Sequence, residues 1–170
     1  MQINHARKTI TLKLVYAGGQ GSGKTANLEY IQNHAAQARE GAIESIRNSS
    51  DQTLLFDFAP FDCEQVDGYG IHFQVFTLPG RTEMQAPQEL GFNGMDGLVI
   101  VIDSRWEAVE VSIRYFEFLQ QSLDAAGIGL ARLPHVFQYS RRDDPDIAPV
   151  HYLEFLFNKY GAPHFMASSL

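Results

Sequence analysis

The sequence predicts an α/β protein whose strands form one mostly parallel sheet with helices on both faces. Two observations support this prediction. Strand-like and helix-like segments alternate along the chain, and residues 98–102 form an uninterrupted apolar run that ends at Asp103. Alternation is typical of parallel sheets joined by helices, and an apolar run of this length is typical of a central strand buried on both faces. The 170 residues are expected to form a single domain.

Each element is predicted from the spacing of its apolar residues. The six predicted strands cover residues 9–17, 54–59, 71–77, 98–102, 135–139 and 164–166. The predicted helices cover residues 24–39, 109–123 and 150–160. Asp67-Gly68 is a hairpin signal, so the second and third strands are expected to pair antiparallel. The polar segment over residues 40–52 is expected to be a mobile loop.

Composition limits the possible functions. The net charge of −7 disfavours general nucleic-acid binding, which usually requires a basic surface. No apolar run approaches the roughly 20 residues that span a bilayer, so no direct membrane insertion is expected. The only cysteine, Cys63, cannot form an internal disulfide, which fits a reducing cytoplasm.

Residues 18–25 read Gly-Gly-Gln-Gly-Ser-Gly-Lys-Thr, a complete G-x-x-x-x-G-K-[ST] phosphate loop between a predicted strand and a predicted helix. In such loops backbone N–H groups and the positive helix N-terminus face the phosphates. Lys24 can reach the β- and γ-phosphates, and the Thr25 hydroxyl can ligate Mg²⁺. A chance Gly-rich turn is disfavoured by the flanking elements. The expected phosphate contacts are Gly18, Gly21, Ser22, Gly23, Lys24, Thr25 and Ala26.

Two further positions suit a sensor of the γ-phosphate. Thr53 stands before the second strand, where its hydroxyl can join Thr25 on Mg²⁺ when a γ-phosphate is bound. Gly80 follows the third strand, where its backbone N–H can approach that phosphate closely because it has no side chain. Taken singly, a β-branched residue at a strand start and a Pro-Gly turn are both common. Together with the phosphate loop they describe a nucleotide switch.

Three segments then resemble one family, the bacterial MglA-type small Ras-like GTPases. They are Thr53-Leu54-Leu55-Phe56-Asp57-Phe58, Thr77-Leu78-Pro79-Gly80 and residues 95–103, and the resemblance runs over about residues 3–169. It implies a Ras-like P-loop fold with a six-stranded, mostly parallel sheet and one antiparallel edge pair. It also implies a cytoplasmic switch in cell polarity and surface motility that binds GTP or GDP with Mg²⁺. The implied partners are a Roadblock/LC7-type activating protein and a motility or polarity effector, with recruitment to the cell pole by a partner.

The base-reading motif departs from the family pattern. Where the family has Asn-Lys-x-Asp, this chain has Ser140-Arg141-Arg142-Asp143. Asp143 can accept from the guanine N1–H and N2–H₂ groups, and the Arg141 stem can cover the base. Ser140 is shorter than asparagine, and one lost hydrogen bond corresponds to an affinity loss of about three- to tenfold. Ser168 lies in the segment that matches the last base-contacting loop. Without the other motifs, these charged residues would be interpreted as a solvated cluster.

The residues of hydrolysis also depart from the pattern. Arg81 stands where the family has the water-orienting glutamine, and Gln52 stands where it has an arginine before the switch threonine, Thr53. One hypothesis is compensation, in which Arg81 stabilises transition-state charge and Gln52 orients water. The other, which the geometric demands of water positioning favour, is that hydrolysis is impaired.

The final helix of the family is expected to be missing. The preceding predicted helix, residues 150–160, is unusually aromatic. Most of its aromatic residues are expected in the core, and some are expected to form a protein-binding patch. Two functions remain open: a switch with weak GTPase activity that forms GDP and phosphate, and a pseudo-GTPase that holds nucleotide and docks a partner. An ATP-specific kinase or ATPase is a third alternative, against which Asp143 and the threonine-led Pro-Gly motif argue.

Overall fold

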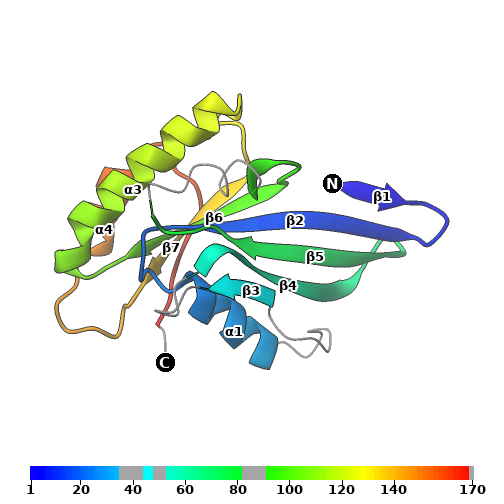
Figure 1. The fold of residues 1–170 in the computed structure, drawn as a ribbon, viewed down its shortest axis with the longest axis horizontal. Coiled ribbons are helices and arrows are strands. Elements are labelled where there is room, and N and C mark those ends of the chain that lie inside the picture. Colours follow the sequence, from blue (N-terminus) through cyan, green and yellow to red (C-terminus); the bar gives the residue numbers. More distant parts are fainter. Residues whose placement is uncertain (35–43, 48–52, 82–90, 169–170) are drawn as a thin grey trace.

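The computed structural model describes residues 1–34, 44–47, 53–81 and 91–168, and these form one twisted sheet with helices on both faces (Figure 1). The strands are β1 (Gln2–Asn4), β2 (Thr9–Ala17), β3 (Glu44–Arg47), β4 (Thr53–Val66), β5 (Tyr69–Thr77), β6 (Gly97–Asp103), β7 (His135–Ser140) and β8 (His164–Met166). The helices are α1 (Lys24–His34), α3 (Trp106–Ala125) and α4 (Val150–Phe157). The predicted α/β class is confirmed.

The strand order is β3-β4-β5-β2-β6-β7-β8, with β1 paired to the first residues of β2. The five strands from β5 to β8 run parallel. All six predicted strands are present, but the count of six is too low, because the sheet has eight. Both additional strands, β1 and β3, are short and pair antiparallel with a neighbour.

The predicted hairpin joins β4 to β5. Asp67 and Gly68 both have positive φ angles, 50° and 77°, and Val66 pairs with Tyr69 across them. This two-residue turn matches the twist of the paired strands. However, β4–β5 is not the edge pair, because β3 pairs with the outer side of β4. Part of the segment expected to be a mobile loop is therefore strand, and residues 40–43 and 48–52 lie outside the described residues.

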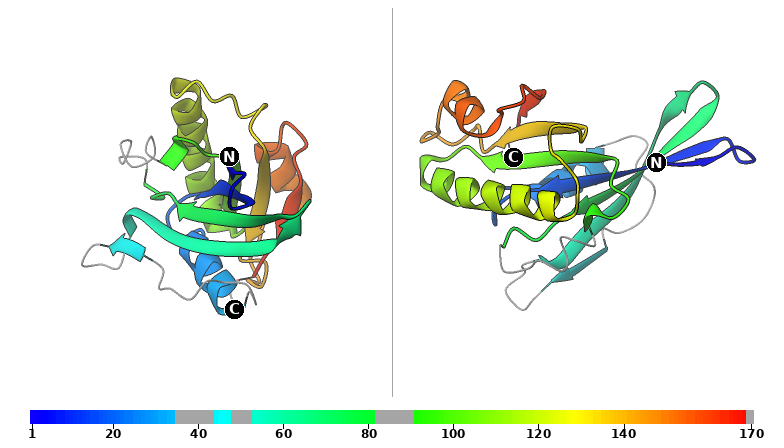
Figure 2. Two further views of the ribbon diagram at one scale, coloured as in Figure 1. Left: turned by 90° about the vertical axis from the view of Figure 1, so that its right-hand side faces the viewer. Right: turned by 90° about the horizontal axis from the view of Figure 1, so that it is seen from above.

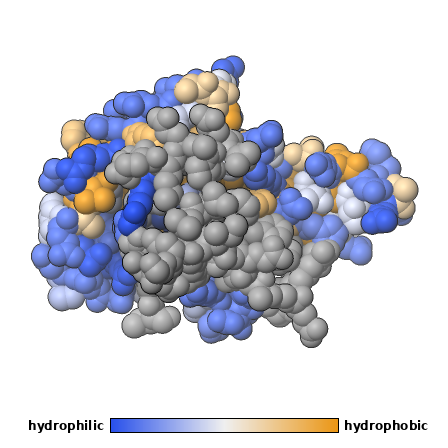
Figure 3. Space-filling model, viewed as in Figure 1, coloured by the Kyte–Doolittle hydropathy of each residue, from blue (hydrophilic) through white to orange (hydrophobic). Residues whose placement is uncertain are grey.

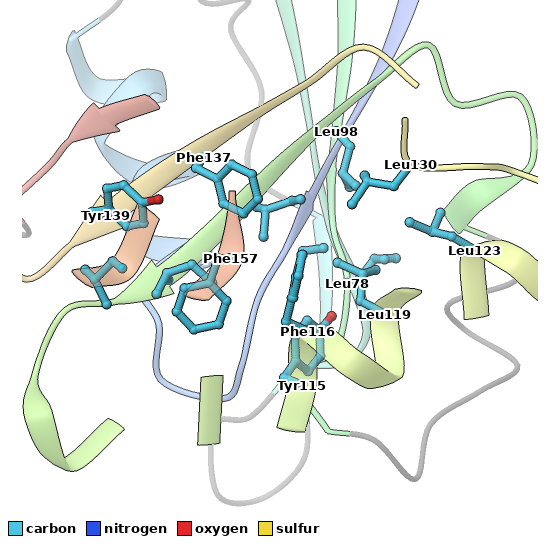
Figure 4. Close-up of a cluster of buried hydrophobic side chains, with 14 of the residues drawn as sticks. Leu78, Leu98, Tyr115, Phe116, Leu119, Leu123, Leu130, Phe137, Tyr139 and Phe157 are labelled. Carbon is cyan, nitrogen blue, oxygen red and sulfur yellow. The ribbon is translucent and has the colours of Figure 1, made fainter. Parts of the chain in front are cut away.

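The main hydrophobic core lies between the sheet and helices α3 and α4. Alternate residues of β6 and β7 face these helices (Figure 4). The ring of Phe137 packs against Phe116 of α3, Phe116 packs against Phe157 of α4, and Tyr139 stacks on Phe137. Helix α1 covers the opposite face, where the buried Leu28 packs with Val75. Two turned views show α1 on one side of the sheet and α3 and α4 on the other (Figure 2).

Helix α4 is less buried than its composition suggests. Leu153 and Phe157 are core residues, whereas Phe155 is 81% exposed and Tyr152 is 37% exposed. The helix ends at Phe157, three residues before the predicted end, and Tyr160 lies exposed beyond it. The expectation that most of its aromatic residues are core is therefore wrong for Tyr152, Phe155 and Tyr160. None of the helices in the described residues is long and apolar enough to cross a membrane.

Candidate nucleotide-binding site

The phosphate loop connects β2 to α1, and its backbone requires glycine at three positions. Gly21 and Gly23 have φ angles of 76° and 97°, a region that other residues rarely adopt. A Cβ atom on Gly18 would overlap the carbonyl oxygen of Val101 and lie 2.8 Å from the Ser22 Oγ atom. The loop is therefore pressed against the end of β6, which holds it beside the other strand ends.

Lys24 begins α1 and is 8% exposed. Its Nζ atom donates to the carbonyl oxygens of Gly18 and Gly19 at 2.7 and 2.9 Å. A buried ammonium is costly unless it is well paired, so these carbonyls keep the charge at the centre of the loop. Phosphate oxygens are stronger partners for an ammonium than carbonyls are, because they carry negative charge.

A pocket of about 320 Å³, here called the phosphate pocket, opens over this loop. Three cationic side chains line it, those of Lys24, Arg81 and Arg141, and none of the described residues around it is acidic. The whole chain has a net charge of −7, so the charge of the described pocket lining is opposite in sign to that of the protein as a whole. Such a site favours an anion with several charges, such as a polyphosphate. Thr25 lines the same pocket, where its hydroxyl suits a metal that takes few protein ligands and several waters, as Mg²⁺ does.

Leu78 and Gly80 of the Pro-Gly segment, Leu78-Pro79-Gly80, line this pocket directly after β5. The Leu78 N–H donates to the Tyr16 carbonyl at 2.9 Å, and the Pro79 carbonyl accepts from the buried Tyr115 hydroxyl at 3.4 Å. Gly80 then lies directly against the phosphate loop, since a Cβ atom on it would be 2.6 Å from the Gln20 Cα atom. The absence of a side chain at Gly80 is what allows the two segments to touch.

This approach brings Arg81 to Gln20, a residue to which no sequence pattern assigns a role. The Arg81 Nε–H donates to the Gln20 Oε1 atom at 3.2 Å. The only signal in the sequence is a long polar side chain at a variable position of the glycine-rich motif. Its partner 61 residues away can be found only from the fold.

Ser140 ends β7 and points toward the phosphate loop. Its hydroxyl lies 2.8 Å from the Ser22 carbonyl oxygen and 3.1 Å from that of Ile102, and its single proton is donated to one of them at a time. Both Ser140 and Ser22 are buried. Although serine is shorter than asparagine, this side chain still ties the base-reading motif to the phosphate loop.

Arg141 follows in a left-handed conformation, with a φ angle of 59°. Its Nε atom is buried and has no hydrogen-bond partner among the described residues. A non-glycine residue in this region is strained, and such strain often accompanies a binding site. With this backbone conformation, Arg141 lines the phosphate pocket.

A second depression, here called the α1 groove, has a volume of about 560 Å³ and shares Gly23 and Ala26 with the phosphate pocket. Ser140 and Ser168 line it, and the Arg142 N–H donates to the Ala167 carbonyl at 3.1 Å, which holds the two loops together. Asp143 is exposed on the turn after β7 and lines neither of these two depressions. Hydrophilic residues dominate the visible surface of α1 (Figure 3).

The structure therefore brings most of the predicted site residues together at one end of the parallel strands. Gln52 lies outside the described residues, and Thr53 is placed by its backbone alone, as the first residue of β4 paired with Arg47. No cluster of three or more His, Cys, Asp or Glu side chains that could hold a metal occurs in the described parts of the chain.

The fold and the loop define a P-loop nucleotide-binding protein with a Ras-like fold. No protein-family model matches the chain. The chain is 34% identical over 165 residues to the mutual gliding-motility protein MglA of Myxococcus xanthus (strain DK1622), a match that covers 97% of this chain and 85% of that protein. The chain belongs to the MglA family of small Ras-like GTPases.

Proposed function

We propose that this protein is a guanine-nucleotide-dependent switch that binds GTP or GDP with Mg²⁺ and hydrolyses GTP slowly. The observation that supports the proposal most is the phosphate pocket, where the buried Lys24, two arginines and the start of α1 surround a space and none of the described lining residues is acidic. A polyphosphate is the ligand that suits this charge and shape. Family membership makes GTP or GDP the expected polyphosphate.

The base and the cation are assigned to the remaining residues. Ser140, Arg141, Asp143 and Ser168 are proposed to contact the base, with Asp143 selecting guanine through its N1–H and N2–H₂ groups. Asp143 must approach the base on binding, because it lines neither depression described above. Thr25 and Thr53 would hold Mg²⁺, which would neutralise part of the phosphate charge.

Slow hydrolysis is proposed because the residue after the Pro-Gly segment is an arginine. Its Nε–H is engaged by Gln20, so Arg81 is placed to contact phosphate charge and has no carbonyl to accept a proton from water. Single-turnover hydrolysis by the wild type and by Arg81→Gln tests whether Arg81 and Gln52 compensate for each other. Compensation predicts a slower variant, whereas impaired hydrolysis predicts a clearly faster one.

The contact between Arg81 and Gln20 also favours a second candidate function, a pseudo-GTPase that holds nucleotide and docks a partner without significant hydrolysis. Calorimetric titration with GDP, GTP and ADP in the presence of Mg²⁺, followed by phosphate release, separates the candidates. Tight guanine binding with measurable release supports the switch, and binding without release supports the pseudo-GTPase. A preference for ADP would contradict both.

The process served is proposed from the family. The relative is named for gliding motility, and we propose that this chain likewise acts in motility or cell polarity through protein partners in the cytoplasm. A Roadblock/LC7-type activator, an effector and recruitment to the cell pole are the expected elements. Co-purification with the chain loaded with GDP or with a GTP analogue tests this: a partner should be retained in one nucleotide state and released in the other.

A further inference from the structure

We infer that Gln20 is a positioning residue that holds the Arg81 guanidinium over the phosphate pocket, so that the pair distinguishes nucleoside triphosphate from diphosphate. The inference rests on the proposed function, because it concerns the ligand of the same pocket. It assigns a role to a residue of the phosphate loop that the motif itself leaves variable.

The geometry of the pair depends on Gly80. The close approach of Gly80 to the Gln20 backbone brings the next residue, Arg81, beside the loop. The Nε–H of Arg81 then meets the Gln20 Oε1 atom at 3.2 Å. Because Nε lies on one edge of the planar guanidinium, this bond restricts the plane of the whole group.

The position of Gln20 and Arg81 explains why they would contact the terminal phosphate of a triphosphate. Gln20 and Arg81 line the phosphate pocket together with Lys24, but they come from the phosphate loop and from the segment after β5. A diphosphate would be held by the loop and by the N-terminus of α1. A third phosphate would add negative charge beside Gly80, and Arg81 is the cation next to Gly80, whereas the other arginine of the pocket, Arg141, comes from the turn after β7.

A purely structural role is the competing explanation, and measurements of nucleotide selectivity can test it. Both Gln20 and Arg81 are exposed, and hydrogen bonds between exposed side chains contribute little to stability. A structural pair would therefore change neither folding nor nucleotide selectivity appreciably. A positioning pair changes the selectivity while stability stays near that of the wild type.

The experiment measures affinities for GDP and for a non-hydrolysable GTP analogue in Mg²⁺, using the full chain. Gln20→Ala and Arg81→Ala should each lower the ratio of triphosphate to diphosphate affinity roughly tenfold. The double variant should lower it no further than Arg81→Ala does, because the two residues act as one unit. Arg81→Lys keeps the charge but loses the Nε–H, so it should resemble Gln20→Ala.

Arg132→Ala is the matched control, since Arg132 is exposed and lines neither depression. An unchanged ratio in Gln20→Ala and Arg81→Ala would overturn the inference, and so would independent effects that multiply in the double variant. Failure of the proposed function has a different signature: the wild type itself would then bind neither guanine nucleotide. Thermal unfolding of every variant checks that each one folds.

Discussion

The Ser140 hydroxyl donates to the carbonyl oxygen of Ser22 at 2.8 Å, so the last residue of β7 is tied directly to the phosphate loop. The two residues are 118 positions apart and both are buried. The bond fixes the distance between the part of the site assigned to the base and the part assigned to the phosphates. A nucleotide that spans both parts benefits, because the two halves need not be brought together on binding.

Replacement of Ser140 by alanine tests this tie. Ser140→Ala leaves a buried carbonyl without its donor, so we expect a loss of about 1 kcal/mol in the free energy of unfolding. Nucleotide affinity should fall by about three- to tenfold. Chemical denaturation and calorimetry measure the two effects.

Ser104 provides the matched control, because its Oγ atom is buried but has no hydrogen-bond partner among the described residues. Ser104→Ala removes only an unpaired hydroxyl and should be neutral or slightly stabilising. Equal destabilisation by the two variants would show that the Ser140 bond to the loop contributes nothing specific.

Lys24→Ala should abolish triphosphate binding, because Lys24 is the cation at the centre of the phosphate loop. Its Nζ atom already bridges the carbonyl oxygens of Gly18 and Gly19. Calorimetric titration with a GTP analogue measures the effect. Lys159→Ala, which removes an exposed lysine beyond α4, is the control and should bind like the wild type. Unchanged affinity in Lys24→Ala would contradict the proposed site.

Gly80→Ala should force the Pro-Gly segment away from the phosphate loop. The new methyl group would lie 2.6 Å from the Gln20 Cα atom, so one of the two backbone segments has to move to relieve the overlap. We expect a destabilisation of about 1–3 kcal/mol together with weaker triphosphate binding. Gly129→Ala is the control, since its nearest neighbour is a flexible Arg132 side chain 3.9 Å away. Wild-type behaviour of Gly80→Ala would show that this close approach is not required.

Tyr139 should make stability depend on alkaline pH. Burial raises the pKa of its phenol well above the ordinary value, and a hydrogen bond to Glu154 raises it further. Above about pH 10 the unfolded chain releases this proton while the folded chain keeps it, so the free energy of unfolding should fall as the pH rises. Burial also raises the pKa of Tyr16, so Tyr16 and Tyr139 should both ionise late in a spectrophotometric titration of the folded protein.

Tyr139→Phe checks the assignment. It should remove one late-titrating group and reduce the alkaline loss of stability, measured by denaturation at several pH values. At neutral pH the variant should be about 1 kcal/mol less stable than the wild type, because Glu154 loses a donor. An identical alkaline profile in the variant and the wild type would assign the late titration to another residue.

Local sequence patterns predicted those strands and turns whose conformation requires particular residue types. The apolar run of β6 and the Asp67-Gly68 turn are examples, because burial on both faces and positive φ angles each demand particular residue types. The sequence did not predict strand β3, which reads Glu-Ser-Ile-Arg. Its conformation depends on pairing with β4, and a short polar segment carries no pattern that indicates such pairing. Phe155 was misjudged for a similar reason, since only the packing of α4 decides which of its faces is covered.

By itself the sequence determined the family and the phosphate loop, because the loop's conformation is encoded in contiguous residues whose glycines permit it, and it predicted the roles of Lys24 and Thr25. Only the tertiary structure decided that Ser140 ties β7 to this loop, and that Gly80 places Arg81 on Gln20. The physical reason is distance along the chain. A hydrogen bond between residues 61 or 118 positions apart exists only when the packed sheet brings two strand ends together.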